Sequence, residues 1–291
     1  MDAGEIIKRI RKIEIKTKGL SKNIFSGEYH SAFKGVGMSF AEVRAYKYGD
    51  EVKNIDWNVT ARTNEPYIKT FEEERELTVM LLVDISKSTF FGSKSKLKSE
   101  VAAEISAVLA FSAITNNDKV GAILFTDKIE KFIPPKKGKK HILRIIREII
   151  YFTPENNGTD LSLALKYLNN VNKKRSIVFI LSDFMTEGYE TPLRLAGKRH
   201  DVIGIHIFDQ SEFRLPSVGL VKIIDPETGD RKIIDTSSKS LKRQYEQRYA
   251  DNFKYFKNNF NKIGLDTVEV GVKDDYALAL HKFFKRRMTR S

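Results

Sequence analysis

Short apolar runs without polar alternation recur along the chain. They lie within residues 78–83, 120–125 and 176–181, and residues 201–209 and 267–272 are two further predicted core strands. A strand that alternates apolar and polar residues has one face in water, whereas an uninterrupted apolar strand is buried on both faces. Strands of the second kind are typical of parallel sheets covered by helices on both sides. The sequence therefore predicts a mostly parallel central sheet.

Between these runs lie segments whose apolar residues recur every three or four positions, the spacing of an amphipathic helix. They cover residues 94–117, 141–152, 161–168, 238–263 and 275–287. Strands that alternate with helices form βαβ units, whose crossover helices lie on the faces of the sheet. We therefore expect an α/β, doubly wound, Rossmann-like domain over residues 77–287, with a β-hairpin insertion near residues 215–237.

Residues 1–76 precede the first buried run and are predicted to form an extension of the main domain. Residues 1–25 carry apolar residues at helical spacing, and residues 66–71 are predicted to be extended. No Gly/Ser/Pro linker separates that strand from the core, so we expect this β-containing extension to pack on the sheet. The segment 41–63 holds the only tryptophan, Trp57, among charged residues. It suits either an ion-paired brace anchored by its aromatic ring or an interaction surface.

Composition excludes several classes of protein. The chain has 291 residues, of which 41% are hydrophobic, and this is enough for a substantial core. It has no cysteine, so disulfides, thiolate metal sites and cysteine nucleophiles are excluded. No apolar run of about 18 residues is present, and the acidic first residues do not suit a signal peptide. A cytoplasmic location is therefore expected.

The net charge of +13 is concentrated towards the end of the chain. Residues 232–291 carry 14 basic and 7 acidic residues, a net charge of +7. Such a region can attract nucleic acid, an anionic membrane surface or an acidic protein, and it can also serve solubility alone. Binding of nucleic acid or of an anionic surface is accordingly the alternative function.

Polar residues with oxygen side chains follow three of the predicted strands and loops. Asp84, Ser86 and Ser88 come directly after the first buried run, Thr159 follows a glycine before a predicted helix, and Asp183 follows a later run. The carboxyl ends of parallel strands meet at one edge of a sheet, where ligands commonly bind. Carboxylate and hydroxyl oxygens suit a hard cation such as Mg²⁺ or Mn²⁺. The sequence predicts a metal site at this edge.

The Asp-x-Ser-x-Ser motif, the later Thr159 and the later Asp183 resemble the metal-ion-dependent adhesion site of von Willebrand factor type A domains. The resemblance covers about residues 77–287, and all five ligand positions match. The extension adds a second resemblance, to the bacterial family called domain of unknown function 58. It rests on residues 44–46, 49–50, 55–57, 61–63, 67–69 and 71–75.

These resemblances imply a function and partners. Members of the domain of unknown function 58 family usually accompany MoxR-type AAA+ ATPases, and they are thought to act with them as adaptors in protein assembly or activation. The implied role is a non-enzymatic, metal-dependent adaptor that binds an acidic side chain of a protein partner, without a small-molecule substrate or nucleic acid. Peripheral association with the inner membrane is left open.

Enzymatic functions fit the motifs poorly. Aspartyl-phosphate phosphatases place a second carboxylate two residues after the nucleophile, and that position is Ser86 here. The chain has no Gly-x-Ser-x-Gly elbow of a serine hydrolase. A two-metal nuclease needs more carboxylates than this rim offers. His206 lies inside a buried run, which favours a core histidine over a ligand.

Overall fold

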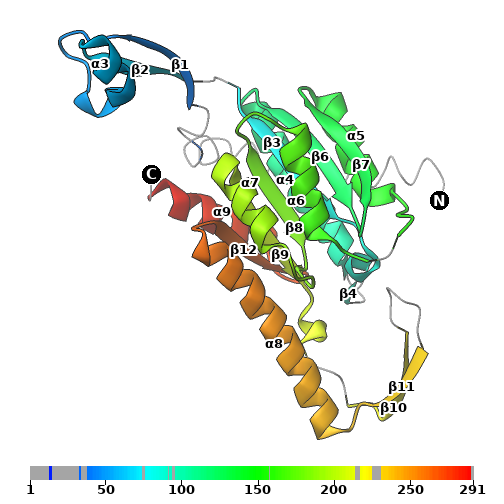
Figure 1. Ribbon diagram of the computed structural model, residues 1–291. Helices are drawn as coiled ribbons and strands as arrows, with labels where there is room; N and C mark the ends of the chain where they lie inside the picture. Colours follow the sequence, from blue (N-terminus) through cyan, green and yellow to red (C-terminus); the bar gives the residue numbers. More distant parts are fainter. Residues whose placement is uncertain are drawn as a thin grey trace.

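The computed structural model of the protein describes residues 13–14, 33, 38–73, 76–90, 92–93, 96–156, 158–213, 217–224 and 231–289. Its centre is a six-stranded sheet with the order β12-β9-β8-β3-β6-β7 (Figure 1). The strands are β3 (Thr78–Asp84), β6 (Lys119–Phe125), β7 (Ile129–Lys136), β8 (Ile177–Ser182), β9 (Asp201–Phe208) and β12 (Asp266–Gly271). Neighbouring strands are parallel except at the β6–β7 edge. The predicted α/β, mostly parallel fold is confirmed.

Among the described residues, six helices of ten residues or more cover the two faces of this sheet. They are α4 (Lys98–Thr115), α5 (Lys139–Tyr151), α6 (Leu161–Val171), α7 (Glu190–Arg199), α8 (Lys239–Lys262) and α9 (Tyr276–Met288). Side chains of α4, α5 and α9 belong to one apolar cluster, and those of α6, α7 and α8 to the other. Successive residues of β3 alternate between the clusters, with Leu81 in the first and Leu82 in the second. This double burial explains the uninterrupted apolar run.

Helix α7 has no counterpart among the predicted helices. Its sequence contains Pro192 and Gly197 and only a few apolar residues, so the helical spacing is weak. Tertiary contacts stabilise it: Leu193 and Ala196 are buried in the second cluster. The helix lies beside β9 and α6, on the same face of the sheet as α6 and α8 (Figure 1).

The extension forms a small unit of β1 (Met38–Ala45), the 3-10 turn η2 (Val52–Asn54), α3 (Trp57–Thr63) and β2 (Tyr67–Glu73). Strands β1 and β2 are antiparallel. Figure 1 shows this unit beyond the end of the sheet where β3 begins, opposite to the end where β3 stops. Ile13 and Phe33 pack in the core of the main domain, whereas none of the described side chains of β1, α3 or β2 belongs to its apolar clusters. The rest of the predicted helix over residues 1–25 lies outside the described residues.

Trp57 does not anchor this unit. Its side chain is 68% exposed, and Tyr48 is fully exposed. The unit is held instead by an ion pair in which both guanidinium nitrogens of Arg44 donate to the carboxylate of Asp50, each over 2.9 Å. Asp56 begins α3 by accepting from Asn58 N. The interpretation of Trp57 as an anchor is therefore wrong, whereas the ion-paired part of that interpretation is confirmed.

An arm projects past the carboxyl end of the sheet. It consists of the hairpin β10 (Leu220–Ile224) and β11 (Arg231–Asp235) and of the first half of α8 (Figure 1). The hairpin falls within the predicted insertion. Shorter elements near the same end are η3 (Lys87–Phe90), β4 (Gly92–Ser93), β5 (Lys96–Leu97) and η4 (Gln210–Glu212).

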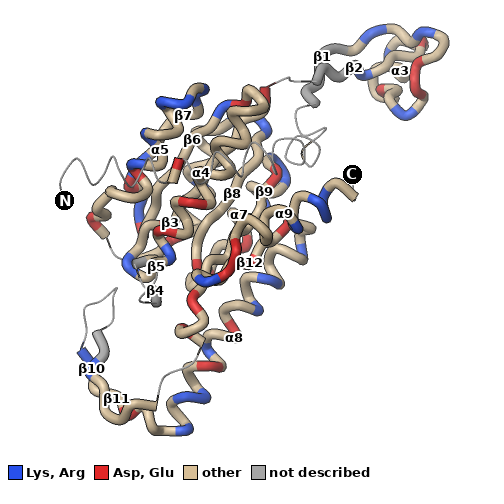
Figure 2. The backbone as a smooth tube through the Cα atoms, turned by 180° about the vertical axis from the view of Figure 1, so that it is seen from behind, with Lys and Arg blue, Asp and Glu red and all other residues tan. Residues whose placement is uncertain are grey.

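The basic residues of the C-terminal region are spread along α8 and α9 and interspersed with acidic ones (Figure 2). Some are structural: Arg287 pairs with Asp201 and, over 3.0 Å, with Asp266, and its guanidinium lies 4.7 Å from the centre of the Phe33 ring. Among the described residues, no helix combines the length and the hydropathy that a membrane span requires.

Candidate metal centre

Strands β3 and β8 place two polar residues side by side at the carboxyl end of the sheet. Val83 is paired with Leu181, so Asp84 and Ser182 follow as neighbours. The Ser182 hydroxyl donates to Asp84 Oδ2 over 2.7 Å. Both side chains are buried. Asp84 is therefore held in one orientation by a neighbouring strand.

The Asp-x-Ser-x-Ser loop folds back over Asp84. Ser86 N donates to Asp84 Oδ1 over 2.9 Å, and the hydroxyls of Ser86 and Ser88 lie 3.0 Å apart. The loop is closed by Thr89, whose N and Oγ1 both donate to Ser86 O. The two serine hydroxyls and the carboxylate therefore form one group, as the motif predicts.

Asp183 joins this group from the end of β8. Its Oδ2 accepts from Lys98 Nζ over 2.8 Å, and its Oδ1 accepts from Met185 N over 3.3 Å. The Ser88 hydroxyl also contacts this carboxyl. The structure therefore brings Asp84, Ser86, Ser88 and Asp183 together.

Thr159 lies on a loop beside the same rim. It directly precedes Asp160, which begins α6 by accepting from Leu163 N. The carbonyl of Thr159 accepts from Thr186 Oγ1 over 3.2 Å, which ties this loop to the segment that follows Asp183. The described contact of Thr159 is thus a backbone contact with the segment after Asp183, and not a contact of its hydroxyl with the four clustered side chains.

The two buried aspartates have pKa values that move in opposite directions. Burial, followed by repulsion from Asp183, raises the pKa of Asp84 to about 6. Burial also works against ionisation of Asp183, but the Lys98 ammonium, together with the hydrogen bonds from Met185 N and the Ser88 hydroxyl, outweighs burial and the pKa of Asp183 is lowered. The pair therefore lies close enough for one charge to oppose the other, which is the situation that a bound cation relieves.

Three further residues complete the centre and were not predicted as site residues. Ser182 orients Asp84, while Lys98 and Glu212 form a buried ion pair, with Lys98 Nζ 2.6 Å from Glu212 Oε1. Burial raises the pKa of Glu212, and the two neighbouring carboxylates outweigh burial to raise the pKa of Lys98. The position of Ser182 beside Asp183 was a visible signal. Lys98 and Glu212 are 114 residues apart, and no local pattern joins them.

The chemistry of the centre suits a hard cation. The cluster holds the buried carboxyl groups of Asp84 and Asp183 and the partly buried carboxyl group of Glu212, but the Lys98 ammonium is their one nearby cation among the described contacts, so the cluster lacks positive charge. Among the described residues no group of three or more His, Asp or Glu could hold a metal, so an ion here would rely on hydroxyl oxygens beside two carboxylates.

His206 lies behind the rim, paired in register with Ser182. It is buried as predicted, but its Nδ1 has no hydrogen-bond partner among the described residues. Its ring is surrounded by Phe184, Phe208, Phe253 and Phe256. Burial lowers the pKa of His206 to about 4.

This burial predicts an acid-sensitive contribution to stability. Between pH 6.5 and pH 4 the histidine is protonated in the unfolded chain but stays neutral in the folded protein. Its contribution to the free energy of unfolding is therefore fully present above pH 6.5 and is lost as the pH falls towards 4. His206→Phe should lessen the loss of unfolding free energy between pH 7.5 and pH 4.5 by about 2–3 kcal/mol. Urea denaturation measures this, and the difference at pH 8 reports packing alone. An unchanged pH dependence would contradict the assignment.

The fold and the rim define a class: an α/β domain of the Rossmann-like strand order with a cluster of Asp and Ser oxygens at the carboxyl ends of its strands. The comparison with known families is more specific. Residues 42–255, more than half of the chain, match the family described as "Protein of unknown function DUF58", and the chain belongs to this family.

Similar proteins include an uncharacterised protein of Mycobacterium tuberculosis (strain H37Rv), 29% identical over 232 residues that cover 79% of this chain and 73% of the relative. Among solved structures, an aerotolerance-related membrane protein of Bacteroides fragilis has a TM-score of 0.49 and 15% identity, with 74% of this chain and 100% of that chain covered. BatB of Bacteroides thetaiotaomicron has a TM-score of 0.45 and 17% identity, with the same coverage. The functional argument therefore rests on the rim itself.

Proposed function

We propose that the protein is a non-enzymatic interaction adaptor that binds an acidic side chain of a protein partner through Mg²⁺ or Mn²⁺ at the rim of the sheet. The observation that carries this proposal is the buried cluster around Asp84 and Asp183, which combines excess negative charge with serine hydroxyls. The cluster lies at the edge of the sheet where ligands of open α/β folds bind.

The ligand count explains why a partner is needed. Asp84, Ser86, Ser88, Thr159 and Asp183 would hold the ion, and Mg²⁺ prefers about six oxygen ligands. Water would complete the set, and a carboxylate from another protein can take the place of that water. Because three of the five proposed protein ligands are neutral hydroxyls and the rest of the set is water, the ion keeps an exchangeable position that a carboxylate can fill in a partly dehydrated environment.

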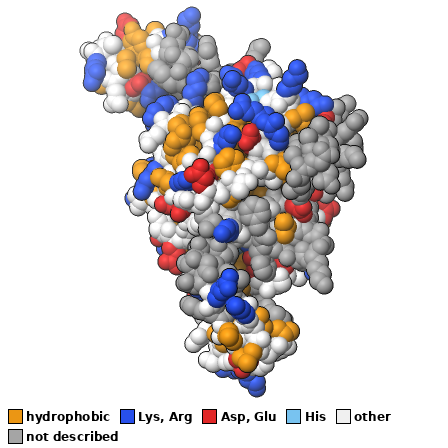
Figure 3. Space-filling view, turned by 90° about the vertical axis from the view of Figure 1, so that its right-hand side faces the viewer, with side chains coloured by type: hydrophobic (Ala, Val, Ile, Leu, Met, Phe, Trp, Pro, Cys, Tyr) orange, Lys and Arg blue, Asp and Glu red, His pale blue; other side chains and the backbone are white. Residues whose placement is uncertain are grey.

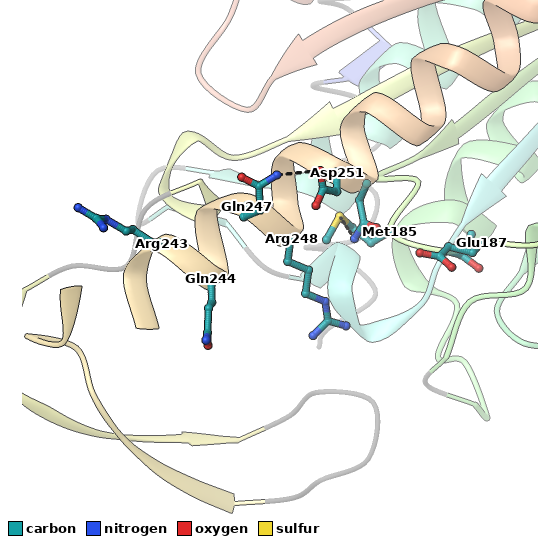
Figure 4. A pocket seen from close by; sticks show the side chains of 9 residues that line it. Met185, Glu187, Arg243, Gln244, Gln247, Arg248 and Asp251 are labelled. Atoms are coloured by element: carbon teal, nitrogen blue, oxygen red, sulfur yellow. Dashed lines mark hydrogen bonds between the residues drawn. The ribbon is translucent and has the colours of Figure 1, made fainter. Parts of the chain in front are cut away.

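A groove beside the rim supports a protein as the ligand. Its volume is about 870 Å³, and it lies between the segment after Asp183 and the first half of α8 (Figure 4). Met185, which is 39% exposed, lies at the rim side of the groove, and Arg248 and Gln244 extend from α8 into the open space. A partner that reached the rim would therefore meet apolar, amide and guanidinium groups.

The hairpin of the arm presents further apolar surface on the same side of the sheet. Leu220 is 76% exposed, Ile233 74% and Val218 64%. Orange side chains mark this lowest lobe of the molecule in Figure 3. Exposed apolar side chains that are grouped, rather than scattered, commonly mark interaction sites. The arm and the groove together form a surface suited to a protein.

Nucleic acid is the weaker candidate. Basic residues of the C-terminal region are interspersed with acidic ones, and Arg287 is committed to Asp201 and Asp266. A continuous basic face would be needed for strong binding to phosphates.

The resemblance to MoxR-associated adaptors points to a MoxR-type AAA+ ATPase, or its client, as the partner. The test is capture of the purified ATPase of the same organism by the immobilised protein in Mg²⁺ and in EDTA. We expect capture in Mg²⁺, and we expect its loss in EDTA and in Asp84→Ala. Glu65→Ala, which removes an exposed carboxylate of the extension, should leave capture unchanged. Capture that is indifferent to both EDTA and Asp84→Ala would show that the rim is not the contact.

A further inference from the structure

The side chain of Lys98 is almost completely buried, which is rare for a lysine. Lys98 is the first residue of α4, and its side chain is 2% exposed. Its Nζ lies 2.8 Å from Asp183 Oδ2 and 2.6 Å from Glu212 Oε1. A buried ammonium is tolerated only when carboxylates surround it in this way. The rim thus contains a cation that belongs to the protein itself.

This ammonium uses an atom that the proposed metal ion needs. Asp183 Oδ2 accepts from Lys98, and Asp183 Oδ1 accepts from Met185 N, so both oxygens of this carboxylate are engaged. Asp84 is engaged similarly by Ser86 N and the Ser182 hydroxyl, but these donors are neutral and stabilise a carboxylate without repelling a second cation. Of the groups that donate to Asp84 and Asp183 in these hydrogen bonds, only the Lys98 ammonium is positively charged, so only Lys98 repels a metal ion electrostatically.

Glu212 gives the ammonium a second place to bind. It belongs to η4, and its other oxygen, Oε2, accepts from Asp209 N over 3.0 Å, so the carboxylate is fixed in position. Lys98 can therefore release Asp183 and still keep one buried partner. A charge that moves between two fixed carboxylates avoids the large cost of a buried, unpaired ammonium.

We propose that Lys98 is a built-in competitor of the metal ion, bound to Asp183 and Glu212 in the metal-free protein and to Glu212 alone when the metal is present. The inference rests on the proposed metal site. It assigns Lys98 a role in setting the affinity of that site, because a divalent ion must first displace the ammonium from Asp183. Like charges repel strongly where water is excluded, so the lysine makes metal binding weaker and reversible.

The location of Glu212 extends the consequence to the arm. Segment η4 follows β9 and precedes the β10–β11 hairpin along the chain. When Lys98 leaves Asp183, the link between α4 and η4 becomes the sole ion pair of the lysine. The ion pair that ties the first turn of α4 to the segment leading into the arm therefore carries the whole charge of the lysine only when the metal is bound.

The test is isothermal titration of Mg²⁺ into the wild-type protein and Lys98→Met, which removes the charge and keeps a long apolar stem. We expect Lys98→Met to bind Mg²⁺ at least 10-fold more tightly. Glu212→Gln, which keeps the lysine but removes its second carboxylate, should bind Mg²⁺ several-fold more weakly. The opposite signs distinguish competition from a general disturbance of the rim.

A second measurement keeps the test informative if Lys98→Met is poorly folded without metal. The variant leaves the carboxyl groups of Asp183 and Glu212 without their ammonium, so its midpoint of thermal unfolding in EDTA should fall below that of the wild type. Added Mg²⁺ should raise this midpoint more in Lys98→Met than in the wild type, because only a bound ligand stabilises the folded state by mass action.

Each outcome has a distinct meaning. Tighter binding by Lys98→Met supports competition, and binding by Lys98→Met alone would also support it while overturning the metal-dependent function of the wild type. Equal or weaker binding by Lys98→Met, with a wild type that binds Mg²⁺, would overturn the competitor role and leave the proposed function standing. If neither protein binds Mg²⁺ or Mn²⁺, both proposals are wrong.

Discussion

Replacing Asp84 by alanine should abolish binding of Mg²⁺ and Mn²⁺ altogether. Asp84 is the carboxylate at the centre of the cluster, held by Ser86 N and by the Ser182 hydroxyl. Its removal leaves Asp183 as the one carboxylate of the proposed ligand set, and Lys98 already neutralises that carboxylate. A site with so little remaining negative charge binds a hard divalent cation poorly.

The measurement is isothermal titration of each metal into wild type and variant at constant ionic strength. The wild type should bind one ion per chain with an affinity in the micromolar to millimolar range, because two carboxylates and neutral hydroxyls make an open site. The variant should give only heat of dilution. Glu65→Ala serves as the matched control, since it removes an exposed carboxylate from the extension. An isotherm that survives Asp84→Ala would place the metal elsewhere.

The fold could be predicted because its signals are local. Strands β3 and β8 are buried on both faces, and each is an uninterrupted run of apolar residues that can be recognised in the sequence without knowledge of distant contacts. The site motif was visible for a related reason: Asp84, Ser86 and Ser88 lie within one loop, and Asp183 follows the strand that pairs with β3. The order of parallel strands was enough to place them at one edge.

The parts that could not be predicted depend on contacts between distant segments. Lys98 was an ordinary residue of an amphipathic helix until the structure placed its Nζ between Asp183 and Glu212, which lie 85 and 114 residues away. A lysine near a helix terminus is normally solvated, so neither its burial nor its partners have a local signal. Trp57 is the opposite case: its large aromatic side chain suggested burial, but it is exposed in the structure.

Strand β7 contains Pro134 and Pro135 and continues through them to Lys136. The pairing with β6 slips at this point: Val120 pairs with Lys136, while Ala122 pairs with Ile133. Prolines are tolerated at the edge of a sheet and at bulges, because they lack the N–H of a regular ladder. Gly121 occupies the opposing position and lets the bulged strand approach closely.

Gly121→Val should therefore destabilise the fold by about 3 kcal/mol or more. A Cβ atom at residue 121 would lie 2.9 Å from Ile133 O and 2.9 Å from Pro135 N, which are backbone atoms, as well as 2.8 Å from Met80 Sδ. The thioether can rotate away, but the backbone can retreat only by breaking the β6–β7 pairing. The expected result is a lower urea midpoint with an unchanged dependence on denaturant, or loss of soluble protein.

Gly158→Ala is the matched control for this substitution. An added Cβ there would meet nothing closer than 3.5 Å, an ordinary contact with Asp127, so its stability should stay within about 1 kcal/mol of the wild type. Strand β6 is the neighbour of β3, whose last residue is Asp84, so the same clash would disturb the support of the rim. If Gly121→Val unfolds at the wild-type midpoint, the bulge adapts without cost, and the close approach of β7 is not what requires glycine.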